Sequence, residues 1–398
     1  MKKIENRIVI VVRETRLEKV LAAQNTVSQA KFYINQLGGD FEEYETEHNH
    51  YSQSVRKARQ DLDAIANIQV LGRQYLPNFI FAPGDIVVAV GQDGLVANTL
   101  KYLDGQPLIG INPDPARWDG VLLPFKPEDA AKIVKETAGG RRRLEEVTMA
   151  SAKVQNGQEL LAVNDFFIGQ KGHASARYII KYGGVKEPQS SSGVIVSTGL
   201  GSTGWMKSVI AGANRISSSV IGRPYGSSTE SEELSVEEGE YTLQEEWDDT
   251  ADMLIEEAAA IPEPAAGPDA GEPSPERGVN FCKLIMPEEP PCVFKSAEPL
   301  ARKVKRKKSF GISELSSVVG KWSSGELLFA VREPFPSKTT GTNMVFGKIT
   351  PGETLRIESL MGENGVIFSD GIESDFIAFN SGAEAAITIA GKKGRMVV

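Results

Sequence analysis

The stretch IVVAVGQDGLVANTLKYL, residues 86–103, decides how this chain folds. Five apolar, mostly β-branched residues run directly into Gly91-Gln92-Asp93-Gly94, and a helical pattern begins at once. This order predicts a buried strand, a tight turn and a helix whose N-terminus lies beside the turn. Because ligands of open parallel sheets bind beyond the carboxyl ends of the strands, we expect Asp93 at a binding site.

Two interpretations of Asp93 remain open on these residues. Gly91 and Gly94 allow the backbone to approach a ligand or to adopt positive φ, and the following helix N-terminus attracts phosphate. A carboxylate there can accept a proton from an attacking hydroxyl or hold Mg²⁺ between phosphates. The alternative is an ordinary turn or N-cap, for which Asp is also preferred.

Strand and helix patterns alternate through residues 1–140, which predicts a doubly wound, mostly parallel sheet. The expected strands are residues 7–13, 41–45, 78–82, 85–90 and 107–112, and the expected helices are 17–37, 51–66, 95–104 and 127–138.

Residues 141–223 and 311–398 have a different pattern. Short β-branched and aromatic runs are separated by turn residues, and helical patterns are scarce. This composition predicts a second, antiparallel and β-rich domain. The fold class is therefore α/β, with a parallel N-terminal sheet followed by a β-rich part.

The segment 224–310 matches neither pattern. Residues 224–276 carry 17 Asp and Glu without Lys or Arg and become rich in Pro and Ala, whereas 302–308 (RKVKRKK) are strongly basic. We interpret the acidic part as a disordered insertion or long surface loop. A second hypothesis is that it folds back on the basic run and inhibits a basic site.

Composition excludes several classes of function. Outside the acidic segment the net charge is about +8, although the whole chain has −9. A mildly basic body suits an anionic small molecule, but no patch is basic and aromatic enough to predict nucleic-acid binding. No apolar run approaches 18 residues, so we expect no membrane span and interpret MKKIENRIVIVV as the first strand of a cytoplasmic protein.

Cysteine is too rare to suggest a disulfide framework, and histidine is too rare to suggest a metal site. Cys282 and Cys292 do not make a disulfide framework, and a reducing compartment is the simpler interpretation. The three histidines, His48, His50 and His173, are too scattered for a zinc site, and we expect no protein-only metal site.

Three further stretches carry polar groups at the ends of apolar runs. Asn164-Asp165 ends one run and can bind sugar hydroxyls or form a turn. Residues 191–205 (SSGVIVSTGLGSTGW) alternate glycines with hydroxyls, so the loop can line a ligand surface with Trp205 free to stack. Asp370-Gly371 is a third acid–glycine pair, which a hairpin turn also explains.

Taken in order, these pieces resemble the NAD kinase family, within the group that also holds diacylglycerol and sphingosine kinases. The family has GGDGT after an apolar strand, then G-I-N, an Asn-Glu or Asn-Asp pair, TPTGSTAY and a late S-x-DG hairpin. This chain has GQDGL (91–95), GINPDP (110–115), ND (164–165), TGLGSTGW (198–205) and FSDG (368–371). The order agrees over about residues 7–220 and 325–398.

The resemblance implies transfer of the γ-phosphate of ATP, with Mg²⁺, to a hydroxyl, which is the ribose 2′-hydroxyl of NAD(H) in NAD kinases. It makes Asp93 the general base and implies a homo-oligomer with its substrate between two domains. The implied nucleotide and substrate contacts are Gly91, Gln92, Gly94, Asn112, Asn164, Asp165, Thr198, Gly201, Ser202, Thr203 and Trp205.

The chain departs from the family pattern at several positions. Gln92 replaces a glycine, Leu95 a threonine and Trp205 a tyrosine. A Cβ at residue 92 resists positive φ and crowds an approaching phosphate. The stretch GHASARY does not fit the pattern, although Arg177 in it is a candidate phosphate ligand because of its fork of donors. Asp114 and Arg117 are similar candidates after the next strand.

Three functions therefore stay open. The first is an ATP-dependent kinase acting on NAD(H). The second is a kinase for another hydroxyl acceptor, a sugar or nucleoside, which Gln92, Leu95 and Trp205 motivate. The third is a regulator that binds nucleotide without turnover and uses the insertion as an interaction arm.

Overall fold

The computed structural model describes residues 3–117, 119–221 and 318–398. The predictions for segment 224–310, including its acidic and basic runs and Cys282 and Cys292, lie outside these residues. The helices are α1 (Arg16–Gln24), α2 (Val27–Gln36), α3 (Phe41–Asp63), α4 (Asp93–Lys101), α5 (Ala130–Ala138) and α6 (Trp205–Ile221), with 3-10 turns at Arg73–Asn78, Pro127–Asp129 and Gly201–Thr203.

Within the described residues the strands fall into a first, parallel group and a later, mostly antiparallel group. The first group is β1 (Arg7–Val12), β2 (Asn67–Gly72), β3 (Ile86–Val90) and β4 (Pro107–Ile111). The later strands are β5 (Leu144–Val154), β6 (Glu159–Ala162), β7 (Asp165–Gln170), β8 (Ala176–Tyr182), β9 (Val185–Ser191), β10 (Gly193–Ser197), β11 (Leu327–Arg332), β12 (Phe346–Ile349), β13 (Leu355–Ser359), β14 (Gly365–Ser369), β15 (Ile372–Ala378) and β16 (Glu384–Val397).

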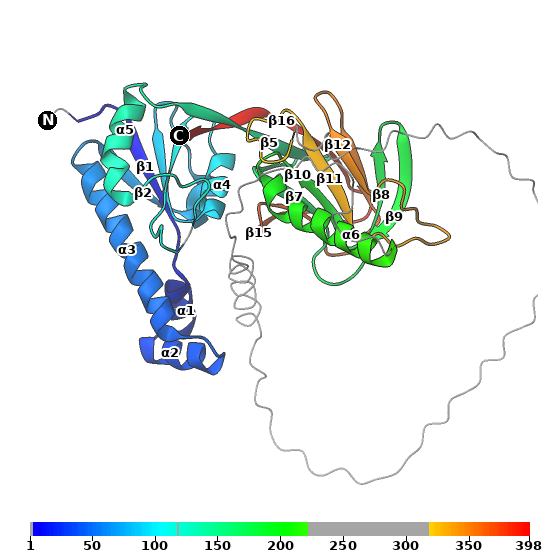
Figure 1. Cartoon of the computed structure of the whole chain (residues 1–398), viewed down its shortest axis with the longest axis horizontal. Coiled ribbons are helices and arrows are strands. Elements are labelled where there is room, and N and C mark those ends of the chain that lie inside the picture. The colour runs from blue at the N-terminus through cyan, green and yellow to red at the C-terminus, as the bar shows by residue number, and fades with distance from the viewer. Residues whose placement is uncertain (1–2, 118, 222–317) are drawn as a thin grey trace, which may run out of the picture. The chain divides into compact units, whose positions relative to one another are not determined.

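The first four strands form a parallel sheet with helices on both faces, as predicted. Their order is β2-β1-β3-β4, and each neighbouring pair is parallel. Helices α3 and α5 pack with Ile8, Ile10 and Val88 on one face, while α4 packs on the other (Figure 1). The chain therefore leaves the neighbouring strands β1 and β3 toward opposite faces of the sheet.

The stretch that we quoted first folds as expected. All five residues of β3 are buried, and α4 begins at Asp93, two residues after the end of the strand. The seven residues Leu95–Lys101 of α4 are buried as well. A helix that is buried on all sides needs apolar partners on each side. Helix α4 packs on the parallel sheet, and Val163 and Leu200, from the connections after β6 and β10, belong to the same apolar cluster.

Two element predictions in the first part are wrong. Residues 41–45 are the first turns of α3 and not a strand, because Asp40 caps the helix by accepting a hydrogen bond from Glu42 N at 2.9 Å. Buried Phe41, Glu47 and Tyr51 then follow a helical period. Residues 78–82 are not a strand either, because β2, which the sequence pattern did not predict, takes the free side of β1.

The predicted helix 17–37 is two helices. Asn25 has φ of 61° and ends α1, and Thr26 caps α2 by accepting a hydrogen bond from Gln29 N. Left-handed Asn is a common helix stop.

The later strands form the antiparallel, β-rich part that the sequence predicts. Strands β12-β11-β10-β7-β14-β15 make a six-stranded sheet, and β13, β8, β9, β5 and β6 join β16 in the other. Strand β16 also pairs in parallel with β4 through Arg395 and Met396, so a single ten-stranded sheet holds both groups. In the part of the chain that is described, no helix has the length and apolarity that a membrane crossing requires.

Candidate functional site

Asp93, the expected base, is held by main chain. Its carboxylate accepts hydrogen bonds from Leu122 N at 2.7 Å and Val121 N at 3.2 Å, in the loop that follows β4. Burial raises the pKa of Asp93, the negative charge of Asp119 adds to this, and the two backbone hydrogen bonds oppose it. A carboxylate has about four lone-pair positions, so two remain for another donor or a metal.

Of the two roles that we gave the glycines around Asp93, close approach to a ligand or positive φ, the second is wrong. Neither Gly91 nor Gly94 has positive φ. Gln92 has φ of −110°, an extended value that any side chain adopts, so its Cβ causes no strain. Gly94 is exposed, and a Cβ there would meet nothing within 4 Å. A glycine at position 92 is therefore not required by the backbone.

Asn164 and Asp165 contact the late Asp-Gly hairpin through their backbone. Asp370, with φ of 55°, is fully buried and its Oδ1 accepts hydrogen bonds from the backbone N–H of Val163, Asn164 and Asp165 at 3.1, 2.6 and 3.3 Å. Asp370 N donates in return to Asp165 O at 2.9 Å. The hairpin turn was the simpler interpretation of Asp370-Gly371, and the structure adds this anchoring role.

The side chains of Asn164 and Asp165 have no hydrogen-bond partner among the described residues. Asp165 is only 7% exposed. Burial, and next to it the charge of Asp370, raise the pKa of Asp165 to about 8. A buried carboxyl without a protein partner is costly to keep, so this position is a strong candidate for ligand contact.

Lys101 is a site residue that sequence reasoning missed. Its side chain is 3% exposed, and Nζ donates to Ser369 Oγ at 2.9 Å and lies 3.6 Å from Asp370 Oδ2. Lys101 is the last residue of α4, the helix that begins with Asp93. The sequence signal for Lys101 was a single lysine within an apolar helix pattern. That pattern could not identify its partner, because Ser369 is 268 residues away.

The turn at residues 198–203 packs directly on Asn164. Thr198 N donates to Asn164 O at 2.9 Å, and Thr198 Oγ1 donates to Val163 O at 2.6 Å. A Cβ on Gly201 would lie 2.0 Å from Asn164 O, so only glycine fits there. The structure thus brings together the Asn-Asp pair, this turn and the Asp-Gly hairpin.

Most hydroxyls of this turn are already bonded within the turn itself. Ser202 Oγ donates to Gly199 O at 2.6 Å and is 1% exposed, and Thr203 Oγ1 donates to Leu200 O at 3.0 Å. Trp205 is half-buried, stacks on Phe167 with ring centroids 5.8 Å apart, and has the guanidinium of Arg332 over its ring. These side chains shape the turn, and a bound ligand would find main chain there more readily than hydroxyls.

Two other predicted contacts lie apart from this group. Arg177 is exposed near the start of β8, just after the loop that leaves β7 at Gln170. Asp165 is at the opposite end of β7, about 16 Å along the strand from Gln170. Asn112 is buried at the end of β4, where its Oδ1 accepts from Asp114 N at 3.0 Å and shapes the loop that reaches Asp93.

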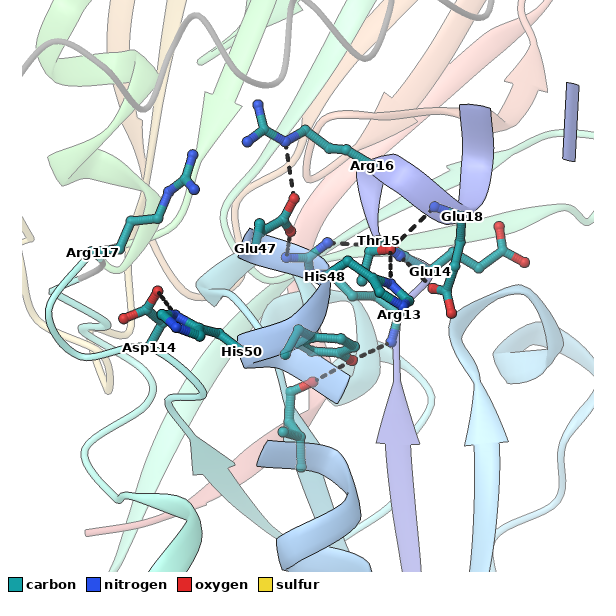
Figure 2. Close-up of polar contacts among 12 residues, drawn as sticks. Arg13, Glu14, Thr15, Arg16, Glu18, Glu47, His48, His50, Asp114 and Arg117 are labelled. Atoms are coloured by element: carbon teal, nitrogen blue, oxygen red, sulfur yellow. Dashed lines mark hydrogen bonds and ion pairs between the residues drawn. The ribbon is translucent and has the colours of Figure 1, made fainter. Parts of the chain in front are cut away.

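A network of arginines and glutamates at the end of β1 was also missed (Figure 2). Arg13 and Arg16 donate to the two oxygens of buried Glu47 at 2.5 and 3.0 Å. Arg117, which the sequence did suggest, donates to Glu43. The missed signal was the helical spacing of Glu43, Glu47 and Tyr51, which places them on one face of α3.

The described residues contain no group of three His, Cys, Asp or Glu that would hold a metal ion. Mg²⁺ bound through nucleotide phosphates needs only one or two protein carboxylates. Asp93, with two lone-pair positions left, fits that smaller demand.

Comparisons with known proteins found solved structures of low similarity and no matching family model or curated protein. No family model matches it, and no curated protein does. An NAD kinase from Archaeoglobus fulgidus in complex with ATP has 13% identity and a TM-score of 0.44, over 98% of this chain and 93% of that one. Yeast NADH kinase complexed with NADH has 11% identity and a TM-score of 0.46, over 99% and 83%. At these values neither protein is evidence for an activity of this chain.

Proposed function

We propose that the chain is an ATP-dependent kinase that phosphorylates a ribose hydroxyl of NAD(H). The observation that carries the proposal is that Asn164-Asp165, the 198–203 turn and Asp370 contact one another, while the two side chains of the pair have no partner among the residues that the structure describes. These motifs are far apart in the sequence and come from the resemblance to NAD kinases, whose order they follow.

In this proposal Asn164 and Asp165 bind the hydroxyls of the acceptor. A ribose offers neighbouring hydroxyls that both donate and accept, which suits an amide and a carboxyl group side by side. Main chain of the 198–203 turn lines the same place, because Gly201 packs on Asn164. Asp93 is the proposed base, and Mg²⁺ would neutralise charge on the transferred phosphate.

The hydrogen bonds of Asp93 also favour a second candidate, a protein that binds nucleotide without turnover. Both oxygens of Asp93 already hold the 121–122 loop. If Asp93 only anchors this loop, the protein can bind nucleotide and leave it unreacted. A sugar or nucleoside as acceptor fits the Asn-Asp pair equally well, so the acceptor must be tested directly.

The test is to incubate the full chain with Mg-ATP and NAD, NADH or a sugar panel, and to measure ADP and phosphorylated product. We expect NADP(H), with a loss of about 10²–10⁴ in rate for Asp93→Asn. Glu128→Gln is the control, since Glu128 is an exposed acid further along the chain.

Each other outcome of this assay has one meaning. A loss below about tenfold for Asp93→Asn would reassign Asp93 to loop anchoring alone. Product from a sugar only would transfer the proposal to that acceptor. Nucleotide binding without ADP from any acceptor would support the non-catalytic candidate.

A further inference from the structure

The switch point between β1 and β3 carries an arginine network that the proposed function does not use. Strands β1 and β3 are neighbours, and their helices α3 and α4 lie on opposite faces of the sheet. The crevice beyond such a strand pair is the general ligand position in open α/β sheets. Tyr51 joins the two strand ends by accepting from Arg13 N at 2.8 Å and donating to Val90 O at 2.9 Å.

Three arginines from different segments converge here on two glutamates of α3. Arg13 follows β1, Arg16 begins α1 and Arg117 lies in the loop after β4. Figure 2 shows the guanidinium groups of Arg16 and Arg117 turned toward the same space beside Glu47. Arg16 and Arg117 donate to the same oxygen of Glu43, Oε1, at 3.1 and 2.6 Å.

The two glutamates differ in how firmly they are held. Glu47 is 6% exposed and binds two arginines through both oxygens, so it belongs to the frame of the site. Glu43 is 50% exposed and uses one oxygen to bridge two guanidinium groups. A phosphate oxygen makes the same bridge with greater charge and more acceptor positions, so it can take the place of Glu43.

Arg13 adds a further hydrogen-bond donor to this network and borders a groove. Arg13 Nε is buried, and none of the described residues accepts a hydrogen bond from it. A groove of about 530 Å³ lies on the Arg13 side of the network and is lined by Arg13, Glu18, His48 and Arg56 among others, whereas Glu43 and Arg117 do not line it. The three arginines bind Glu43 and Glu47, and Glu18 also lines the groove, so the guanidinium donors and not an excess of positive charge favour an anion at this end of the sheet.

We infer that this network binds the phosphate chain of a nucleoside triphosphate, and that Glu43 occupies the phosphate position until the ligand displaces it. The inference rests on the proposed function in one respect, because it assigns the donor's phosphate chain to these residues. Glu43 is then a built-in competitor, which lowers the affinity for anions without touching the acceptor site at Asn164 and Asp165.

The experiment is calorimetric titration of the full chain with inorganic triphosphate and with ATP. Glu43→Gln removes the competing charge, and we expect it to tighten binding about threefold to tenfold, whereas Arg117→Gln loses a charge-assisted contact and weakens binding about tenfold. Glu45→Gln and Arg59→Gln are matched controls, because both side chains are exposed on the same helix, and both should bind like the wild type.

The outcomes separate this inference from the proposed function. Tighter binding by Glu43→Gln and weaker binding by Arg117→Gln, without any phosphorylated product, keeps the inference and removes the kinase. Product formation with unchanged affinity in both variants overturns the inference alone. A wild type that binds neither ligand overturns both the inference and the ATP-dependent kinase. ATP binding more tightly than triphosphate assigns the site to a nucleotide, and equal binding assigns it to free polyphosphate. Arg117→Lys, which keeps the charge without the fork, replaces Arg117→Gln if that variant does not fold.

Discussion

At the scale of single residues, Asp165 carries a clear cost in the free energy of folding. Asp165 is a buried carboxyl that has no hydrogen-bond partner in the described part of the chain, and the second buried carboxyl of Asp370 lies beside it. Asn at position 165 would have nearly the same shape without the charge, so stability alone does not explain an acid there. Keeping an acid at that cost is expected where its protonation state or its oxygens are needed for a ligand.

This cost predicts a pH dependence. The pKa of Asp165 is raised to about 8 by burial and by Asp370, whereas an unfolded Asp titrates near 4. The folded chain therefore holds a proton that the unfolded chain releases, so stability present below about pH 4 is lost as the pH rises toward 8. Asp165→Asn removes this loss, and we expect it to unfold with about 2–5 kcal/mol more stability than wild type at pH 8, while the difference nearly vanishes near pH 4.

Urea unfolding at several pH values measures that difference. Glu45→Gln, an exposed acid on α3, is the control for the change in net charge. Equal stability of Asp165→Asn and wild type at pH 8 would mean that the carboxyl is not desolvated in solution.

At the scale of elements, helix α4 connects the loop held by Asp93 with the hairpin that contains Ser369 and Asp370. Asp93 begins the helix and contacts the loop after β4, and Lys101 ends it and contacts Ser369 and Asp370. Lys392 of β16 donates to the carbonyls of Lys101 and Leu103 at 2.9 and 3.1 Å, which fixes the end of the helix. A shift of α4 would therefore move both Asp93, the expected base, and Lys101, which contacts the Asp370 that holds the Asn-Asp pair.

Lys101→Met tests this connection. Removing the amine leaves Asp370 buried without its cation, and we expect a loss of about 3 kcal/mol in the free energy of unfolding. The double variant Lys101→Met/Asp370→Asn should recover part of that loss, because Asn tolerates the positive φ and leaves no charge. Lys57→Met breaks only an exposed pair with Asp61 and should change stability by less than about 0.5 kcal/mol.

What the sequence could predict at this scale depended on how local the signal was. The strand at 86–90, the helix after Asp93 and the β-rich later part were readable because each pattern lies within a few residues. The helix at 41–63 was misjudged in its first turns because FEEYE also fits a short strand. Contacts such as Lys101 with Ser369, or Arg16 with Glu43, join distant segments and leave no pattern in either one.

At the scale of the molecule, strand β16 links the parallel and the antiparallel groups of strands in the described residues. It pairs with β5 along most of its length, with β13, and in parallel with β4. Met396 and Val397 at its end are buried, the first with α4 and the second in the cluster under α3 and α5. The parallel and antiparallel groups of strands therefore share one strand and two apolar clusters.

Removing residues 394–398 should destabilise the whole chain and not only its last strand. Two buried apolar side chains and the pairing to β4 are lost, which we expect to cost at least about 3 kcal/mol. Guanidinium unfolding followed by both far-UV circular dichroism and tryptophan fluorescence measures it. Lys393→Ala, which removes only an exposed contact to Glu146, is the control. Unchanged stability of the truncated chain would show that β4 does not need this neighbour.

The shared strand has a consequence for amide hydrogen exchange. Because β16 lies in both groups, its amides in the segment paired with β4 and β5 open only when both groups loosen, so they should exchange among the slowest in the chain. A nucleotide that tightens the crevice beyond β1 and β3 would then slow exchange in β5 and β13 as well, far from any atom that it touches.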